Sequence, residues 1–460
     1  MFTIHSKYRP SLFEALTLIF IIVAIIFTSI VKLGTSPHLP IFISIIVLII
    51  FGLMKRIPFR DLEQGMLDGA KSGIGAIYIF FLIGILISSW IVSGTIPTIL
   101  YGGLMVVTAT FFYAIVFIIT AIVGTSIGSS LTTVATVGIA FMTIGQAVDA
   151  SLAITAGAIV SGAFFGDKMS PLSDTTNLAA TIAGIDLFEH IKNMCWTTIP
   201  AFIISCILFA ILSPSIADID TTMVNNYKQT LVNLNIVHLY AVIPLVALIV
   251  CTILKVPTFL TLIISSFTAL LLAPLHMSLS AAQYINVLYS GFVSTSGNEV
   301  IDSLLTRGGM SSMYFTVALV ILSLSLGGLL FVLGIIERLL NAVEALLQSI
   351  GAAVTGAALT AISINTLIGE QYLSILLTGE TFKAKFAELN LHPKNLARVT
   401  EDAGTVINPL VPWSVCGLFI ANMLNVDVLT YLPFAFFCLL SPILTVLFGW
   451  LGITMTKLKS

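Results

Sequence analysis

Long runs of apolar residues decide what this chain can fold into, because runs of about 20 such residues have the length of a membrane-spanning helix. The first is Leu12–Val31, and it is too long for the apolar core of a signal peptide. Further runs are Leu39–Met54, Ile74–Val92, Phe111–Val123, Leu187–Leu212, Val237–Leu254, Phe259–Leu275, Met313–Ile336 and Tyr431–Leu451. Apolar stretches interrupted by Gly, Ser, Thr, Asn and Pro lie between them and predict broken helices or re-entrant hairpins. We therefore predict an all-α polytopic membrane protein with about 11–13 membrane elements.

Composition excludes the main alternatives. Hydrophobic residues make up 58% of the chain and charged residues 9%, whereas a soluble domain carries about 25% charged residues. The net charge of -2 argues against a nucleic-acid partner. The five cysteines form no CxxC pair, and no Walker loop or HExxH motif occurs. The GxSxG pattern at Gly124–Gly128 lacks the strand–turn–helix context of a hydrolase. We expect no cofactor and no enzymatic activity.

Positive charges predict the orientation in the membrane, because short cytoplasmic loops are enriched in Lys and Arg. Lys7 and Arg9 precede the first run, and Lys55 and Arg56 follow the second. Both termini are therefore expected on the cytoplasmic side. We predict one integral membrane domain that consists of an N-terminal span (1–38), a first transporter repeat (39–215), an external linker (216–236) and a second transporter repeat (237–460).

The two predicted repeats share landmarks in the same order. Gly94–Leu100 matches Gly334–Leu340 at the end of an apolar run, and about thirty residues later in each half Gly124–Ser130 matches Asn365–Glu370. Further on, Gly166–Asn177 is paired with Glu401–Pro412, although the spacing of acidic residues and prolines differs. Two such units inverted in the membrane are the plan of secondary transporters. The alternative is that Gly- and Ser-rich spans recur because they pack helices closely.

Two polar segments of the first half carry candidate ion ligands. Thr125, Ser126 and Ser129 lie in a hydroxyl-rich segment broken by glycine. Such a segment must face protein or a water-filled cavity at membrane depth, where hydroxyl and carbonyl oxygens suit a small hard cation. The alternative is that these hydroxyls bond to carbonyls of their own helix.

The segment Gly166–Asn177 predicts a re-entrant hairpin with a charged tip. Its acidic residues, Asp167 and Asp174, lie between two apolar arms, and intramembrane carboxylates mark ion or proton paths. Ser173 and Asn177 belong to the polar run that begins the second arm, where helix N-terminal amides would face the site. The alternative is an ordinary loop with an aspartate at the helix N-cap.

The second half supplies the matching candidates. Glu370 follows the polar residue Asn365 inside an apolar segment and is our preferred second carboxylate. Asp402 and Asn408 lie in the segment that is paired with Gly166–Asn177. All these residues are predicted to bind Na+ or protons.

Three of these segments resemble the NhaC family of bacterial Na+/H+ antiporters. Gly166–Ala180 strongly resembles the signature of that family, and Gly124–Thr136 and Glu401–Trp413 are similar to it as well. The resemblance covers nearly the whole chain. It implies inverted repeats with re-entrant hairpins and exchange of Na+ for H+ driven by the proton gradient. One branch of the family exchanges malate with protons for lactate with Na+, and these motifs do not separate the branches.

From the residues and this resemblance we predict a multi-pass secondary antiporter of the bacterial cytoplasmic membrane that exports Na+ in exchange for protons. Asp167 and a second carboxylate would alternately hold a proton or Na+, and Thr125, Ser126, Ser129 and Asn365 would complete the coordination. In the malate–lactate alternative, helix N-termini and Lys168 would hold the substrate carboxylate. The expected partners are Na+, H+ and the lipid bilayer, with malate and lactate as alternative substrates and a homodimer left open.

Overall fold

The protein is an all-α polytopic membrane protein. The computed structural model describes residues 6–71, 73–106, 111–213, 228–254, 256–275, 277, 279–295, 302, 305–344 and 348–458. Among these residues, five helices are long and apolar enough to cross a bilayer, or eight if each pair of helices bent at a short break forms one span. Shorter apolar helices of 10–17 residues accompany them. The predicted external linker 216–236 lies largely outside the described residues.

Helices of the first half follow the apolar runs closely. They are α1 (Leu12–Phe27), α2 (His38–Met54), α3 (Phe59–Lys71), α4 (Ile74–Val92), α5 (Thr95–Val106), α6 (Phe112–Ile127), α7 (Ser130–Thr133), α8 (Ile139–Ala147), α9 (Leu152–Met169), α10 (Asp174–Ala183) and α11 (Leu187–Leu212). A π-helical turn, Val134–Gly138, joins α7 to α8. The ends of α4 and α5 that flank Gly94 are bent by 72°, which confirms a broken helix at this landmark.

The second half repeats this pattern. Its helices are α13 (Ile243–Ile253), α14 (Thr258–Leu272), α15 (Ala281–Ser290), α17 (Tyr314–Val332), α18 (Ile335–Glu344), α19 (Ile350–Ile368), α20 (Gln371–Glu388), α21 (Pro393–Thr400), α22 (Val415–Leu424), α23 (Val428–Tyr431) and α24 (Phe436–Leu451). A π-helical turn, Glu401–Thr405, continues α21. Between it and α22 lie a short 3₁₀ turn, Asn408–Leu410, and a break.

Helix boundaries in the two halves are related by nearly the same offset throughout. It is 240 residues between α4 and α17 and between the starts of α5 and α18, and 241 residues from the ends of α6 and α19 onward. Helices α6 and α19 end at Ile127 and Ile368, and each is followed by a glycine in the left-handed region. Helices α10 and α22 have ten residues each, and their N-caps are Ser173 and Ser414. The offset also relates the N-caps of α7 and α20, the starts of α9 and α21, and the N-caps of α11 and α23.

This offset corrects one part of the predicted alignment. The prediction paired Gly166–Asn177 with Glu401–Pro412 and therefore matched Asp167 with Asp402. The helix boundaries instead match Asp167 with Asn408 and Pro171 with Pro412. The acidic residue is replaced by an amide in the second half, so acidic spacing misaligned the two segments.

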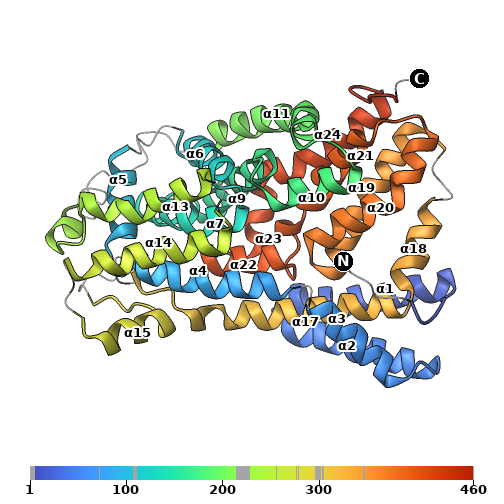
Figure 1. Cartoon of the computed structure of the whole chain (residues 1–460), viewed down its shortest axis with the longest axis horizontal. Coiled ribbons are helices and arrows are strands. Elements are labelled where there is room, and N and C mark those ends of the chain that lie inside the picture. The colour runs from blue at the N-terminus through green and yellow to red at the C-terminus, as the bar shows by residue number, and fades with distance from the viewer. Residues whose placement is uncertain are drawn as a thin grey trace.

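Helices α4 and α17, which have equivalent places in the two halves, each pack against the other half. Helix α4 packs along α14, and α17 packs along α3 and α2 (Figure 1). Gly69 allows the second contact, because a Cβ atom there would lie 2.2 Å from the carbonyl oxygen of Leu324. The two halves are thus interleaved.

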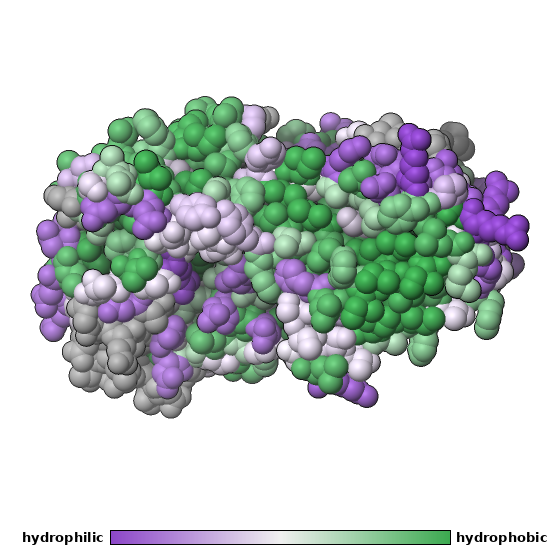
Figure 2. Space-filling view, turned by 90° about the horizontal axis from the view of Figure 1, so that it is seen from below, coloured by the Kyte–Doolittle hydropathy of each residue, from purple (hydrophilic) through white to green (hydrophobic). Residues whose placement is uncertain are grey.

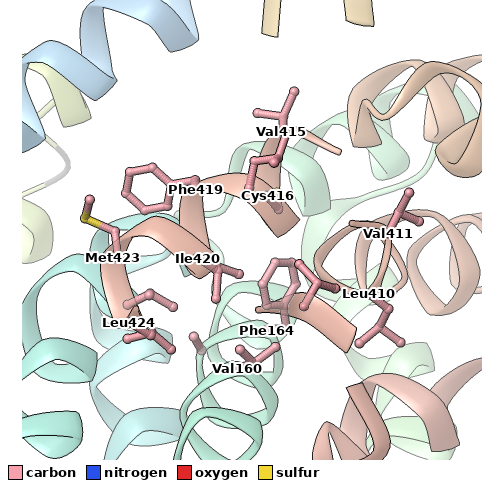
Figure 3. Packing of buried hydrophobic residues seen from close by; sticks show 14 of the residues in the cluster. Val160, Phe164, Leu410, Val411, Val415, Cys416, Phe419, Ile420, Met423 and Leu424 are labelled. Carbon is pink, nitrogen blue, oxygen red and sulfur yellow. The ribbon is translucent and has the colours of Figure 1, made fainter. Parts of the chain in front are cut away.

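A core of buried apolar residues joins the broken helices of the two halves. Val160 and Phe164 of α9 contact the cluster that contains Phe419, Ile420 and Leu424 of α22 (Figure 3). Side chains of α9 and α22, which belong to different halves, are thus part of one core.

Apolar side chains also cover much of the outer surface. On α2, Phe42, Ile46 and Ile50 are exposed. Figure 2 shows a broad hydrophobic area in its right half, with hydrophilic residues gathered at the margin. A soluble monomer rarely exposes such an area, so this surface suits contact with lipid.

Candidate functional site

Four helices begin at one cavity in the middle of the fold. The cavity has a volume of about 310 Å³ and is lined by the first residues of α7, α10, α20 and α22. At the starts of these four helices, five pairs of lining residues are 241 positions apart: Ser129 and Glu370, Ser130 and Gln371, Leu131 and Tyr372, Asp174 and Val415, and Thr175 and Cys416. The cavity therefore lies between equivalent parts of the two halves.

The lining is acidic. Asp167, Asp174 and Glu370 line the cavity, and none of the described lining residues is Lys, Arg or His. The helix N-termini at the cavity carry a partial positive charge, which partly stabilises the negative charge of these carboxylates. The cavity therefore has an excess of negative charge that a cation or protons can neutralise.

Asp167 lies in the last turn of α9 and is 4% exposed. Its Oδ2 accepts a hydrogen bond of 2.8 Å from Oγ of Ser130, the first residue of α7. Close packing of α9 on α6 sets this position, because a Cβ atom on Gly166 would lie 2.4 Å from the backbone nitrogen of Thr125. The prediction placed Asp167 at the tip of a hairpin. The structure places it inside the helix, and the break follows at 170–173.

Glu370 is the N-cap of α20, and its carboxylate accepts a hydrogen bond of 2.8 Å from the backbone nitrogen of Leu373. It follows Gly369, which has a φ of +75°. This left-handed conformation suits glycine and turns the chain sharply at the cavity. Ser129 holds the equivalent N-cap position before α7.

Asp174 lies where two cavities meet. A second cavity of about 440 Å³ is lined by Thr132, Asn177 and Thr261, and it shares Asp174 and Ile79 with the first. Asp174 is exposed, whereas Asp167 is buried. The second cavity thus adjoins the acidic cavity on the side of α10 and α14.

Two predicted ligands of the first half bond to their own helix. Oγ1 of Thr125 donates to the carbonyl of Ala121 at 2.8 Å, and Oγ of Ser126 donates to that of Ile122 at 3.0 Å. Neither lines the acidic cavity. The structure therefore supports the alternative for these two residues, since serine and threonine in helices commonly bond four residues back.

Ser173 and Asn177 stabilise the break before α10. Oγ of Ser173 accepts from the backbone nitrogen of Thr176 at 3.4 Å. Nδ2 of Asn177 donates to the carbonyl oxygens of Pro171 and Ser173 at 3.0 and 2.7 Å. Ser173 does not line the acidic cavity, and Asn177 lines only its neighbour.

Asn365 and Asn408 bond to each other behind the cavity. Nδ2 of Asn408 donates to Oδ1 of Asn365 at 2.8 Å, and Nδ2 of Asn365 donates to the carbonyl of Gly404 at 2.6 Å. Oδ1 of Asn408 accepts from the backbone nitrogen of Cys416 at 3.0 Å. This network holds the break before α22, and neither asparagine lines the cavity.

Asp402 forms a buried ion pair with Lys168, and both side chains are fully buried. Oδ2 of Asp402 also accepts from Oγ1 of Thr197 at 2.8 Å, and Ser441 hydrogen-bonds to both charged groups. The ion pair joins α9 to the π-helical turn of the other half. Asp402 is therefore separate from the acidic cavity, and Lys168 is already paired.

Ser130 and Gln371 are among the polar lining residues that were not predicted from the sequence. Ser130 donates to Asp167, and Gln371 is its counterpart in the second half. Oε1 of Gln371 is buried and accepts no hydrogen bond within the described part of the chain. The signal available in the sequence was position, because each residue is the second after a glycine that ends a helix.

The sequence is similar to known antiporters over most of its length. The sequence profile described as the Na+/H+ antiporter family matches residues 162–453. The Na+/H+ antiporter NhaC of Alkalihalophilus pseudofirmus is 43% identical, with 97% of this chain and 96% of that protein covered. NhaC of Bacillus subtilis is 37% identical, with 95% and 97% covered. The malate-2H+/Na+-lactate antiporter of Bacillus subtilis is 32% identical, with 96% and 95% covered.

Proposed function

The chain belongs to the Na+/H+ antiporter family, and we propose that it exports Na+ in exchange for protons through the acidic cavity. The observation that carries this proposal is the cavity lining, which has three carboxylates and no basic side chain among the described residues. Carboxylate and carbonyl oxygens are the ligands that hard cations prefer. A proton and Na+ then compete for the same carboxylates, which is sufficient to couple their fluxes.

Asp167 is the central ligand in this proposal. It is the most deeply buried of the three acids, and burial of a charge is costly unless a proton or a cation neutralises it. Oε1 of Gln371 is a further oxygen donor without a partner within the described residues. Glu370 and Ser129 supply oxygens at equivalent positions of the two halves, and Asp174 receives ions from the second cavity.

Alternating access follows from the repeated architecture. The offsets of 240 and 241 residues between helix boundaries support two repeats, 39–215 and 237–460, which we propose are inverted in the membrane after an N-terminal span. Transporters of this kind bind substrate at the repeat interface, beside discontinuous helices. Rocking of one set of broken helices against the other would expose the cavity to each side in turn. The bacterial relatives support a bacterial cytoplasmic membrane, and the basic loops favour both termini on its cytoplasmic side.

Exchange of malate and protons for lactate and Na+ is the second candidate. Four helix N-termini face the cavity, and such termini bind carboxylates and other anions. A relative at 32% identity carries that name. However, a dicarboxylate in this cavity would meet three acidic side chains, and Lys168 is paired with Asp402. Simple cation exchange therefore fits the lining better.

Flux in proteoliposomes distinguishes the two functions. Purified protein is reconstituted with a pH gradient and an internal pH dye, and Na+, malate and lactate are added separately and together. We expect Na+ alone to dissipate the gradient, and choline to have no effect. Dissipation that requires malate or lactate would contradict simple Na+/H+ exchange and favour the second candidate.

A further inference from the structure

A corner of the protein outside the acidic cavity carries an open apolar groove. The groove has a volume of about 670 Å³ and is lined by residues of α1, α18, α19 and α24. Leu16 and Leu359 line it and are more than half exposed, and Trp450 stands at its edge, 62% exposed. Nε1 of Trp450 donates to Oγ1 of Thr355 at 2.9 Å, which fixes the indole against α19.

A basic pocket of about 440 Å³ adjoins the same corner. It is lined by Arg9 and Arg338 together with Tyr8, Asn341 and Glu337. Neither arginine has an ion-pair partner among the described residues, and Glu337 accepts a hydrogen bond from Ser6 at 2.7 Å. Two guanidinium groups are thus available to an anion.

Helix α18 connects the two features. Arg338 and Asn341 line the basic pocket, and Leu339 and Leu340 line the apolar groove. The segment before α1 also links the pocket to the groove. Arg9 lines the basic pocket, and Leu12, three residues later, is the first residue of α1 and lines the groove. A ligand that fits both must combine an anionic group with a hydrocarbon chain.

We propose that this corner binds one anionic phospholipid of the membrane. Its phosphate contacts Arg9 and Arg338, and one acyl chain lies in the groove of α1, α18 and α19. Charge complementarity carries the choice of ligand, since basic pockets between membrane helices on the cytoplasmic side bind anionic lipid headgroups. The site is independent of which substrate the acidic cavity transports.

Tryptophan fluorescence tests this proposal directly, because Trp450 lines the groove. Trp196 on α11 is 58% exposed and lies outside both features, while Trp90 and Trp413 are 1% and 8% exposed. In Trp196→Phe the lipid-accessible indole is Trp450, and in Trp450→Phe it is Trp196. Both variants are reconstituted in phosphatidylethanolamine vesicles that contain an equal fraction of brominated phosphatidylglycerol or brominated phosphatidylethanolamine, since bromine quenches indole on contact.

We expect Trp450 to be quenched preferentially by the anionic lipid, with an apparent affinity about fivefold higher for each arginine that contacts the headgroup. Trp196 should show no preference. Arg9→Ala with Arg338→Ala should remove the preference at Trp450, whereas the matched control Arg56→Ala with Arg60→Ala, two exposed arginines outside the pocket, should retain it. Equal quenching of Trp450 by both lipids, or a preference that survives the loss of Arg9 and Arg338, would overturn the proposal.

Discussion

Replacement of Asp167 by asparagine is expected to abolish exchange of Na+ for H+ while the protein still folds and inserts. Asparagine keeps the size of the side chain and can still bond to Ser130. Its amide has no titratable proton and no negative charge, so it cannot hold a proton and Na+ in turn. Fluxes in proteoliposomes should fall to the level of empty liposomes. Asp167→Glu keeps the charge but moves it by one methylene, and we expect partial activity with an altered affinity for Na+.

The matched control is Asp186→Asn, which makes the same chemical change at an exposed N-cap outside the acidic cavity. Asparagine is a good N-cap residue, so this variant should transport normally. Near wild-type exchange by Asp167→Asn would show that Asp167 is structural. The coupling role would then pass to Asp174 or Glu370.

Replacement of Asp402 by asparagine should destabilise the protein rather than alter ion selectivity. The change leaves the charge of Lys168 buried without its partner, and the removal of one member of a buried ion pair costs about 3–5 kcal/mol. Thermal unfolding in detergent can be followed with a thiol-reactive dye, because the thiols of Cys416 and Cys438 are free and buried. We expect the apparent melting temperature to fall markedly.

Two further variants separate the ion pair from other effects. Lys168→Met combined with Asp402→Leu replaces both charges by apolar side chains, so it should recover much of the lost stability. Asp427→Asn changes an exposed aspartate and should alter stability by less than about 0.5 kcal/mol. A stable Asp402→Asn protein with changed Na+ affinity would instead return Asp402 to the ion-binding residues.

The apolar runs and their breaks were predictable because they depend on local sequence. A membrane helix must satisfy its own backbone, so glycines such as Gly94, Gly128 and Gly369 are visible as interruptions. The structure confirms helix ends at Gly128 and Gly369. The predicted repeat rests on the order of these breaks, and the helix boundaries from α6 and α19 onward agree with that order.

Partners of individual polar residues were not predictable, because they depend on distant contacts. Lys168 and Asp402 are 234 positions apart, and no local pattern indicates that one neutralises the other. The hydroxyls of Thr125 and Ser126 have two possible kinds of partner, and only the structure shows that both bond to carbonyls of their own helix. Ser130 and Gln371 were missed because their side chains differ, so no shared residue type marked the two equivalent positions.

Release of protons on binding of Na+ tests the central claim most directly. Purified protein is placed in weakly buffered detergent solution with a pH dye, and NaCl or choline chloride is added. We predict that Na+ but not choline releases protons from the wild type. The release should decrease at high pH, because the carboxylates have already lost their protons. Asp167→Asn should abolish it. Equal proton release by the wild type and Asp167→Asn, or none from an actively transporting wild type, would contradict competition between Na+ and H+ at Asp167.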